Sequence, residues 1–174
     1  MRSVVVLTLL ALLLAFIAWQ ARTGIFRLKN PGEPANKYVR QQQEARDLAA
    51  DEARLIADKF PGAIVTPSGL RYIVRAPGEG SPPPVGAEVS AHYHGTLLTG
   101  QKFDSSHDRG TPYTFRVGRG EVIKGWDEAF AGMKRGERRT LVVPWWLAYG
   151  ETGRPPRIPA RATLVFEVEL VGFR

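Results

Sequence analysis

The C-terminal segment "ATLVFEVELVGF", residues 162–173, alternates apolar and polar side chains with a period of two. Its apolar positions are Leu164, Phe166, Val168 and Leu170. Glutamates occupy the opposite side of the extended chain, a pattern typical of a strand with one buried and one wet face. The segment "EVSAHYHGTL", residues 88–97, alternates in the same way, so the chain is predicted to build an antiparallel sheet with one covered face.

Three further segments are strand candidates: "GLRYIVR" (69–75), "TPYTFRV" (111–117) and "ERRTLVV" (137–143). Glycine and proline clusters separate them, and no internal repeat is visible. Between the last two lies "GEVIKGWDEAFAGM", where Trp126, Phe130 and Met133 follow helical spacing and form one apolar face. We therefore predict an α+β fold, an antiparallel half-barrel around one short helix.

The first residues predict a membrane segment. Residues 3–21 contain no charged side chain and are about as long as the roughly 20 residues that cross a bilayer. The candidate cleavage sites place Phe16 or Trp19 where a signal peptide needs a small residue, which favours an uncleaved anchor over a cleaved signal. Basic residues after the segment would keep the chain in the cytoplasm, whereas signal anchors face outward; we favour a membrane-anchored domain in the periplasm.

The segment from Ala35 to Phe60 predicts a long helix that stops at Pro61 and Gly62. Its apolar stripe is thin, which suits a solvated spacer, with a dimerising helix as the alternative. The predicted domains are an anchor or signal (1–21), a linker (22–34), a helical extension (35–61) and a folded domain (62–174).

Composition excludes several kinds of chemistry. The 174 residues contain no cysteine, which rules out disulfides, cysteine–zinc sites and cysteine nucleophiles. His92 and His94 have the spacing of two metal ligands, but no third ligand is placed to complete a site. The net charge of +7 and the basic turn "KRGERR" (134–139) fit a solvated face, with lipid or nucleic-acid contact as the alternatives. We predict no metal, no cofactor and no nucleic-acid partner.

Aromatic residues on loops and strand ends exceed what one small core requires. They are Tyr93, Phe103, Tyr113, Phe115, Trp126, Tyr149 and Phe166. Asp104, a candidate buried acid, follows Phe103 directly. Spacing alone makes Trp126 a core residue, yet the surplus of rings leaves open a pocket for a guest.

At these residues the chain resembles the FKBP-type peptidyl-prolyl cis-trans isomerases. The resemblance runs from about Val89 to Leu170 and includes "HYHG", "FDSS", "VIKGW", "AYG", "IP" and "ATLVFEVEL" in order. The upstream "TPSGLRY" and the preceding helix are similar to bacterial members, including the macrophage infectivity potentiator group. The resemblance implies about five or six antiparallel strands around one helix, with a hydrophobic pocket between them.

Carried over by position, the resemblance implies a catalytic pocket formed by Asp104, Tyr149, Trp126, Tyr93, Phe103 and Phe166. It implies substrate-binding roles for Arg109, Tyr113, Val122, Ile123, Ile158 and Arg154. Trp126 would form the floor under the proline ring, while the Ile123 N–H and the Tyr149 hydroxyl would donate to substrate carbonyls. Asp104 would orient the site with Arg109 as its partner.

The implied ligands are proline-containing polypeptides and macrolides, and the implied activity assists protein folding. A tethered chaperone or binding module with little isomerase activity is the alternative.

Three positions depart from the family's pattern. Tyr113 stands where many members have phenylalanine, and Arg154 stands where human-type members have histidine, which predicts a changed preference near the pocket mouth. "PWWLAYG" replaces the usual "PPELAYG", so Trp145 and Trp146 are either packing residues or a surface for clients or membrane.

Overall fold

The computed structural model describes residues 50–174. Within this range the chain contains two α-helices, two short 3-10 helices and seven strands. The strands are β1 (Ile64–Val65), β2 (Arg71–Ala76), β3 (Glu88–Leu97), β4 (Lys102–Ser105), β5 (Tyr113–Arg116), β6 (Arg138–Val143) and β7 (Leu164–Phe173). The helices are α3 (Ala50–Lys59), η1 (His107–Arg109), α4 (Lys124–Ala131) and η2 (Trp145–Leu147).

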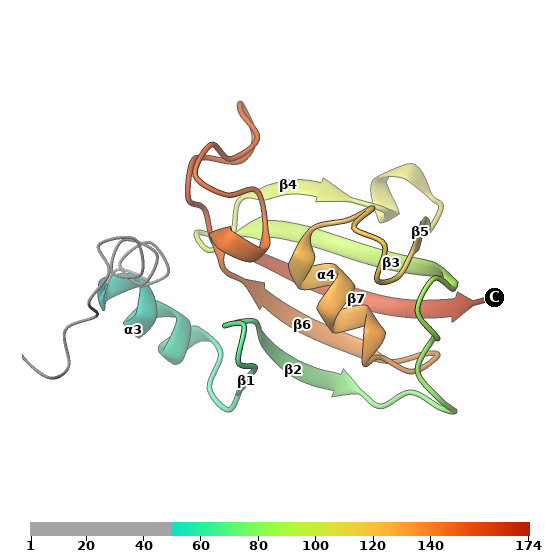
Figure 1. The fold of residues 1–174 in the computed structure, drawn as a ribbon. Helices are drawn as coiled ribbons and strands as arrows, with labels where there is room; N and C mark the ends of the chain where they lie inside the picture. The colour runs from blue at the N-terminus through green and yellow to red at the C-terminus, as the bar shows by residue number, and fades with distance from the viewer. Residues whose placement is uncertain (1–49) are drawn as a thin grey trace, which may run out of the picture. The chain divides into compact units, whose positions relative to one another are not determined.

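All strands belong to one antiparallel sheet in the order β1-β2-β6-β7-β3-β4, with β5 also paired to β3. The long strands β3 and β7 form its centre, where Tyr93 lies opposite Val168 and Gly95 opposite Phe166. Figure 1 shows α4 lying across one face of the curved sheet. The predicted α+β architecture of an antiparallel sheet around one short helix is confirmed.

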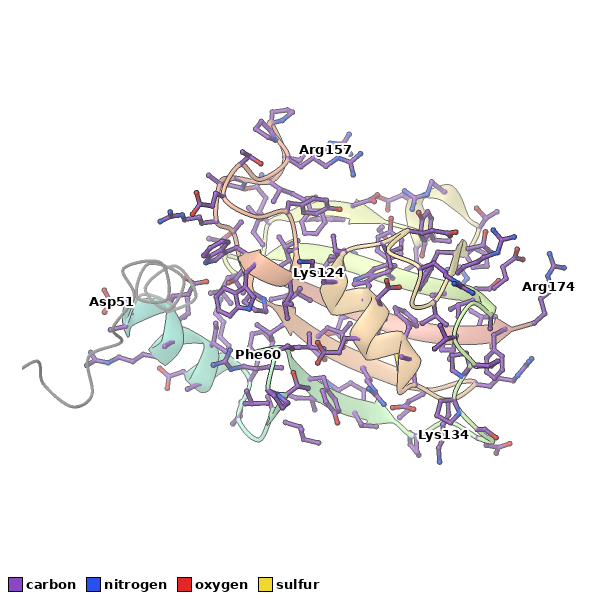
Figure 2. The ribbon with its side chains drawn as sticks, viewed as in Figure 1. Asp51, Phe60, Lys124, Lys134, Arg157 and Arg174 are labelled. Carbon is purple, nitrogen blue, oxygen red and sulfur yellow. The ribbon has the colours of Figure 1, made fainter. Side chains whose placement is uncertain are left out.

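Burial follows the alternation in both long strands. Every second residue of β3 from Val89 to Gly95 is buried, as is every second residue of β7 from Leu164 to Gly172. Trp126, Phe130 and Met133 are all nearly inaccessible, so the apolar face of α4 covers the sheet as its spacing predicts. Side chains from helix and sheet fill the space between them (Figure 2).

The expected strand number was too low. The sequence indicated five strands and the resemblance about five or six, whereas the sheet has seven. β1 has only two residues and β4 only four, and such short strands carry too few alternations to be recognised.

The basic segment 134–139 is largely the solvated face that its composition indicates, since Lys134, Arg135 and Arg138 are exposed, but Arg139 is an exception. Arg139 is only 9% exposed, because its Nε donates to Glu137 Oε1 at 2.6 Å and its Nη2 donates to Gly132 O at 2.8 Å. Its guanidinium also lies 4.6 Å from the centroid of the Tyr72 ring. Arg139 therefore joins the C-terminal end of α4 to the sheet.

The predicted long helix is present in its described part as α3, which ends at Lys59 before Pro61 and Gly62. Ile56 on its apolar stripe is buried. The rest of that helix, the linker and the anchor predicted for residues 3–21 lie outside the described residues. In the range 50–174, no helix combines the length and the apolar character needed to cross a bilayer.

Candidate functional site

Trp126 lies in a ring of aromatic side chains supplied by the sheet and its own helix. Its ring centroid is 5.0 Å from that of Tyr93 on β3, 5.2 Å from that of Phe166 on β7 and 5.3 Å from that of Phe130 on α4. Phe115 on β5 lies 5.8 Å away. Most of these contacts are edge-to-face or tilted, the geometry in which aromatic quadrupoles attract. These four rings pack the indole of Trp126 against the hydrophobic core.

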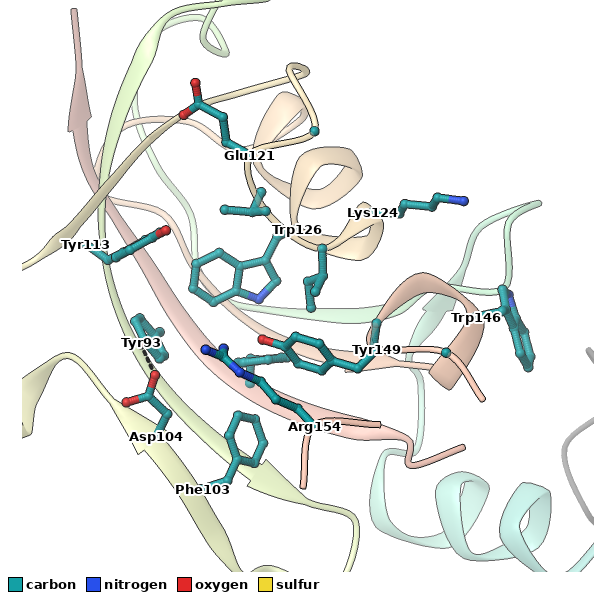
Figure 3. A pocket seen from close by; sticks show the side chains of 16 residues that line it. Tyr93, Phe103, Asp104, Tyr113, Glu121, Lys124, Trp126, Trp146, Tyr149 and Arg154 are labelled. Atoms are coloured by element: carbon teal, nitrogen blue, oxygen red, sulfur yellow. Dashed lines mark hydrogen bonds between the residues drawn. The ribbon is translucent and has the colours of Figure 1, made fainter. Parts of the chain in front are cut away.

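In front of Trp126 opens a cavity of about 790 Å³ (Figure 3), within the size range of small-molecule and peptide pockets. Its wall is formed by Tyr93, Phe103, Asp104, Tyr113, Gly120, Glu121, Val122, Ile123, Lys124, Trp126, Trp146, Ala148, Tyr149, Gly150, Arg154 and Phe166. The floor is aromatic and the polar groups lie around it, an arrangement suited to an apolar ring with polar groups on either side.

Three hydrogen-bond donors of this pocket have no partner among residues 50–174. Among residues 50–174, nothing accepts a bond from the backbone N–H of Ile123 or from the Tyr149 hydroxyl. The Trp126 Nε1–H is buried and likewise has no partner in the described part of the chain. Ile123 and Tyr149 are only half-buried, so their donors are open to carbonyls of a guest, whereas the Trp126 N–H is buried, where an unpaired donor is costly.

One side of the pocket carries a three-residue polar network. The Tyr93 hydroxyl donates to Asp104 Oδ2, a bond marked in Figure 3. Arg109 donates from Nη1 to Asp104 Oδ1 at 2.8 Å and from Nη2 to the Tyr93 hydroxyl oxygen at 2.6 Å. The Ser105 N–H completes the set with a 2.9 Å bond to Asp104 Oδ1. Three donors thus fix the carboxylate at the edge of the pocket.

The network sets the protonation of its members. Burial raises the pKa of Tyr93 to about 12, and the hydrogen bond to Asp104 adds to this, so the phenol stays protonated. Burial alone would raise the pKa of Asp104, but the bonds from Tyr93 and Arg109, the Arg109 charge and the Ser105 N–H together lower it below the ordinary value. The same bonds to Asp104 and Tyr93 raise the pKa of Arg109. Asp104 is therefore a fixed anion and not a proton carrier at neutral pH.

The expectation of a buried acid was wrong in degree. The Asp104 side chain is 38% exposed and that of Arg109 is 47% exposed. The partner expected for Asp104 is nevertheless present at hydrogen-bond distance. Partial exposure lets water share the solvation of the pair, so its geometry matters more than its strength.

Of the twelve residues that the resemblance implies for the site, ten line the pocket. Arg109 lies outside the wall and acts on it only through Asp104 and Tyr93. Ile158 also lies outside the wall and is a core residue, 3% exposed, that packs in the main apolar cluster. The structure thus brings the predicted residues together, while their roles remain predictions.

The sequence did not single out six residues of the wall as site residues: Gly120, Glu121, Lys124, Trp146, Ala148 and Gly150. Most of them are chain neighbours of predicted residues. Trp146 alone had a separate signal, the departure of "PWWLAYG" from the family's pattern.

Trp146 connects the pocket wall to a turn far away in the sequence. Its Nε1–H donates to Ser68 O at 2.9 Å, and the Ser68 hydroxyl donates to Glu128 Oε2 on α4 at 2.6 Å. The Trp145 ring packs edge-on against Trp146, with centroids 5.5 Å apart, and lies under the Arg161 guanidinium. Trp146 is therefore at once a packing residue and part of the pocket wall.

The histidines lie on the other face of β3. The His92 ring stacks on His107 with centroids 4.8 Å apart, and its Nδ1 lies 3.0 Å from Ser106 Oγ. In the part of the chain that the structure describes, no three His, Asp or Glu side chains cluster closely enough to hold a metal ion. These contacts give His92 a structural role.

Comparisons with known proteins match the description of an FKBP-type peptidyl-prolyl cis-trans isomerase to residues 80–171. FK506-binding protein 1 of Dictyostelium discoideum is 48% identical over 106 residues, which are 61% of this chain and 99% of that protein. Peptidyl-prolyl cis-trans isomerase Fkbp12 of Drosophila melanogaster is 48% identical over 104 residues, 59% of this chain and 96% of that protein.

The match to longer relatives is partial. FK506-binding protein 4 of Dictyostelium discoideum is 49% identical over 122 residues, which are 69% of this chain and 33% of that protein. Among solved structures, AtFKBP13 superposes with a TM-score of 0.62 at 41% identity, covering 64% of this chain and 98% of that one. The fold and the enzyme class that the resemblance implied are confirmed at the level of the family, and the chain belongs to the FKBP-type peptidyl-prolyl cis-trans isomerases.

Proposed function

We propose that this chain catalyses cis–trans isomerisation of X–Pro bonds in polypeptides, with the proline ring seated on Trp126. The observation that carries the proposal is the pocket itself: an aromatic floor bordered by donors that have no partner within residues 50–174. Macrolides are the small molecules proposed for the same pocket, since the relatives include proteins named for FK506 binding.

The reaction needs little more than such a pocket. Resonance in the peptide bond creates a barrier of about 18–20 kcal/mol, and uncatalysed X–Pro exchange takes roughly tens to hundreds of seconds. The twisted transition state has lost resonance and part of its charge separation, so an apolar surface favours it over the planar amide. Trp126, Phe103 and Phe166 would supply that surface.

Hydrogen bonds would hold the substrate while its imide bond turns. The Ile123 N–H and the Tyr149 hydroxyl are the proposed donors to carbonyls on either side of the proline. Asp104 would keep Tyr93 oriented against the floor, because its carboxylate accepts a hydrogen bond from the phenol while Arg109 holds the carboxylate from outside. No step of this mechanism forms or breaks a covalent bond.

The test is isomerisation of a short peptide, with leucine or phenylalanine before proline, by the purified full-length chain. We expect catalysis that falls on the order of tenfold or more in Trp126→Ala and Asp104→Leu, with circular dichroism confirming that both variants fold. Tyr113→Phe, which restores the residue common in the family, is the matched control and keeps the pocket apolar. A folded wild-type chain that does not accelerate exchange would instead support a chaperone or binding module with little isomerase activity.

We also propose a location and an assembly. The uncharged residues 3–21 support a membrane-anchored enzyme with its catalytic domain in the periplasm, where it would assist folding. The segment from Ala35 to Phe60, predicted as a helix from the sequence, supports an N-terminal extension like that of the bacterial members, which would act as a spacer or dimerise the chain. A reporter fused to the C-terminus, active on one side of the membrane only, tests the location; sedimentation of the full-length chain tests the dimer.

A further inference from the structure

The charged side chains of the pocket wall are unequally paired. Of its two acids, Asp104 is bound by Arg109, and Glu121 accepts the Arg116 N–H at 2.8 Å while lying 3.8 Å from the Arg116 guanidinium. Of its two cations, neither Lys124 nor Arg154 forms an ion pair with any residue of the described range 50–174. The wall therefore presents positive charge to a guest and no unpaired acid.

Arg154 is held at the pocket by the geometry of its loop. Its N–H donates to Ile158 O at 2.8 Å and its carbonyl accepts the Ile158 N–H at 3.0 Å, while the Ile158 side chain is anchored in the core. The preceding Gly153 has a φ of +67°, and a Cβ there would lie 2.2 Å from Pro159 O, so this turn requires glycine. The backbone of Arg154 is thus fixed although its side chain is exposed.

The side chain then lies along the pocket wall. The guanidinium carbon is 5.8 Å from the centroid of the Tyr149 ring, and Figure 3 shows the guanidinium reaching over Tyr149 toward Asp104 and Tyr93. Lys124 points away from the pocket centre in the same view. Of the two free cations, Arg154 is therefore the one placed beside the proposed proline seat.

We infer that Arg154 selects substrates with an acidic residue next to the proline. The inference rests on the proposed isomerase function and specifies its substrate class. A guanidinium presents a planar fork of donors that matches a carboxylate, and stacking on Tyr149 pre-orients this fork. A carboxylate one residue from the proline would meet it without displacing an ion pair of the protein. Lys124 supplies additional positive potential at the opposite edge.

Solvent exposure of the Arg154 side chain limits how strongly it can favour an acidic substrate. An ion pair open to solvent contributes modestly and is screened by salt, so we expect a glutamate peptide to exceed its glutamine counterpart in kcat/KM by about threefold to fivefold. A lysine peptide should fall below the glutamine peptide, because like charges repel. The preference should shrink in molar salt, where the Debye length is about 3 Å.

The experiment compares peptides that differ only in Glu, Gln or Lys, placed directly before or directly after proline, on the full-length chain. Arg154→Gln should bring the Glu-to-Gln ratio to about one, and Arg154→Lys should restore part of it. Arg157→Gln is the matched control: it removes the same charge from the same loop, at a residue that does not line the pocket (Figure 2) and approaches it only through a long 3.5 Å bond from Nη1 to Phe103 O, and it should keep the ratio.

The possible results distinguish a missing preference for acidic peptides from a missing isomerase activity. Turnover of the glutamine peptides alone reports isomerase activity. If that activity is present but Glu and Gln peptides are equal at both positions, or if Arg157→Gln abolishes the preference as fully as Arg154→Gln, then Arg154 does not select the substrate. If no peptide is turned over, the proposed function fails and the inference fails with it.

Discussion

Replacing Gly125 with alanine tests how closely α4 approaches the sheet. Gly125 lies in the first turn of α4, directly before Trp126. A Cβ at this position would lie 2.5 Å from Val143 Cγ1 on β6, at least about 1 Å closer than the roughly 3.5–4.0 Å of an ordinary carbon–carbon contact. Val143 is fully buried and β-branched, so it has few rotamers into which it can retreat.

Two effects of opposite sign decide the stability of Gly125→Ala. Helix propensity alone favours alanine over glycine by about 1 kcal/mol. Overpacking a dense core costs about 1–3 kcal/mol, and a contact this short places the cost in the upper half of that range. We expect a net loss of about 1–2 kcal/mol, which lowers the Tm of a chain this size by roughly 3–6 °C.

Thermal and urea unfolding of the full-length variants measure this loss of stability. Two further variants in the same region serve as comparisons. A Cβ on Gly132, at the other end of α4, would meet nothing closer than 3.8 Å, so Gly132→Ala should be neutral or stabilising. Val143→Ala removes the obstructing methyls and should make Gly125→Ala less costly in the double variant than the single effects predict.

The same displacement should reach the active site. Pushing α4 from β6 moves Trp126, and we expect kcat/KM for a proline peptide to fall on the order of tenfold. A Gly125→Ala chain as stable as wild type, or more stable, would refute this reasoning, because helix propensity would then outweigh the contact with Val143.

Tyr93→Phe keeps the ring against Trp126 but removes a donor to Asp104, so the pKa of the Asp104 carboxyl should rise in an NMR titration and stability should fall by about 1–2 kcal/mol in urea. An unchanged pKa would show that Arg109 and the Ser105 N–H hold the anion without Tyr93. The pKa of Asp104 is lower in the folded chain than in the unfolded chain, so ionised Asp104 stabilises the fold at pH values above the unfolded pKa of about 3.9. This contribution should be lost as the pH falls through the native pKa, and the loss should be smaller in Asp104→Asn. At alkaline pH, stability should fall between pH 10 and about 12, because Tyr93 ionises at a lower pH in the unfolded chain than in the folded chain. Between about pH 5 and 9, kcat/KM should not change with pH, because neither Asp104 nor Tyr93 titrates there. Trp146→Phe should lower the Tm more than Trp145→Phe, because only Trp146 donates to Ser68 O, a bond of roughly 1 kcal/mol; equal shifts would contradict this role.

Much of the fold followed from local patterns. The alternation of β3 and β7 identified the buried face of each strand, and the spacing of Trp126, Phe130 and Met133 identified the covering face of α4. These features are readable because burial on one side imposes a period of two on a strand and 3.6 on a helix. Most of the site followed from the resemblance, which placed ten of twelve residues on the pocket wall.

Other features depended on contacts between distant segments. Periodicity did not indicate that Trp146 would bond Ser68, 78 residues earlier, or that Arg139 in a basic turn would be buried against Glu137 and Tyr72. Nor did it place Ile158 in the core instead of the pocket. These contacts arise from loop conformation and from the way the sheet curves around α4.

The order of apolar and polar residues along the sequence therefore specifies which side of each helix or strand is buried, because each side chain has its own preference for water or for the core. It does not specify which buried or charged groups meet. That depends on strand register and turn geometry, and a shift of one residue reverses every contact along a strand. The ring contacts that pack Trp126 against the core, and the lack of an ion pair for Arg154 within residues 50–174, are consequences of the tertiary structure.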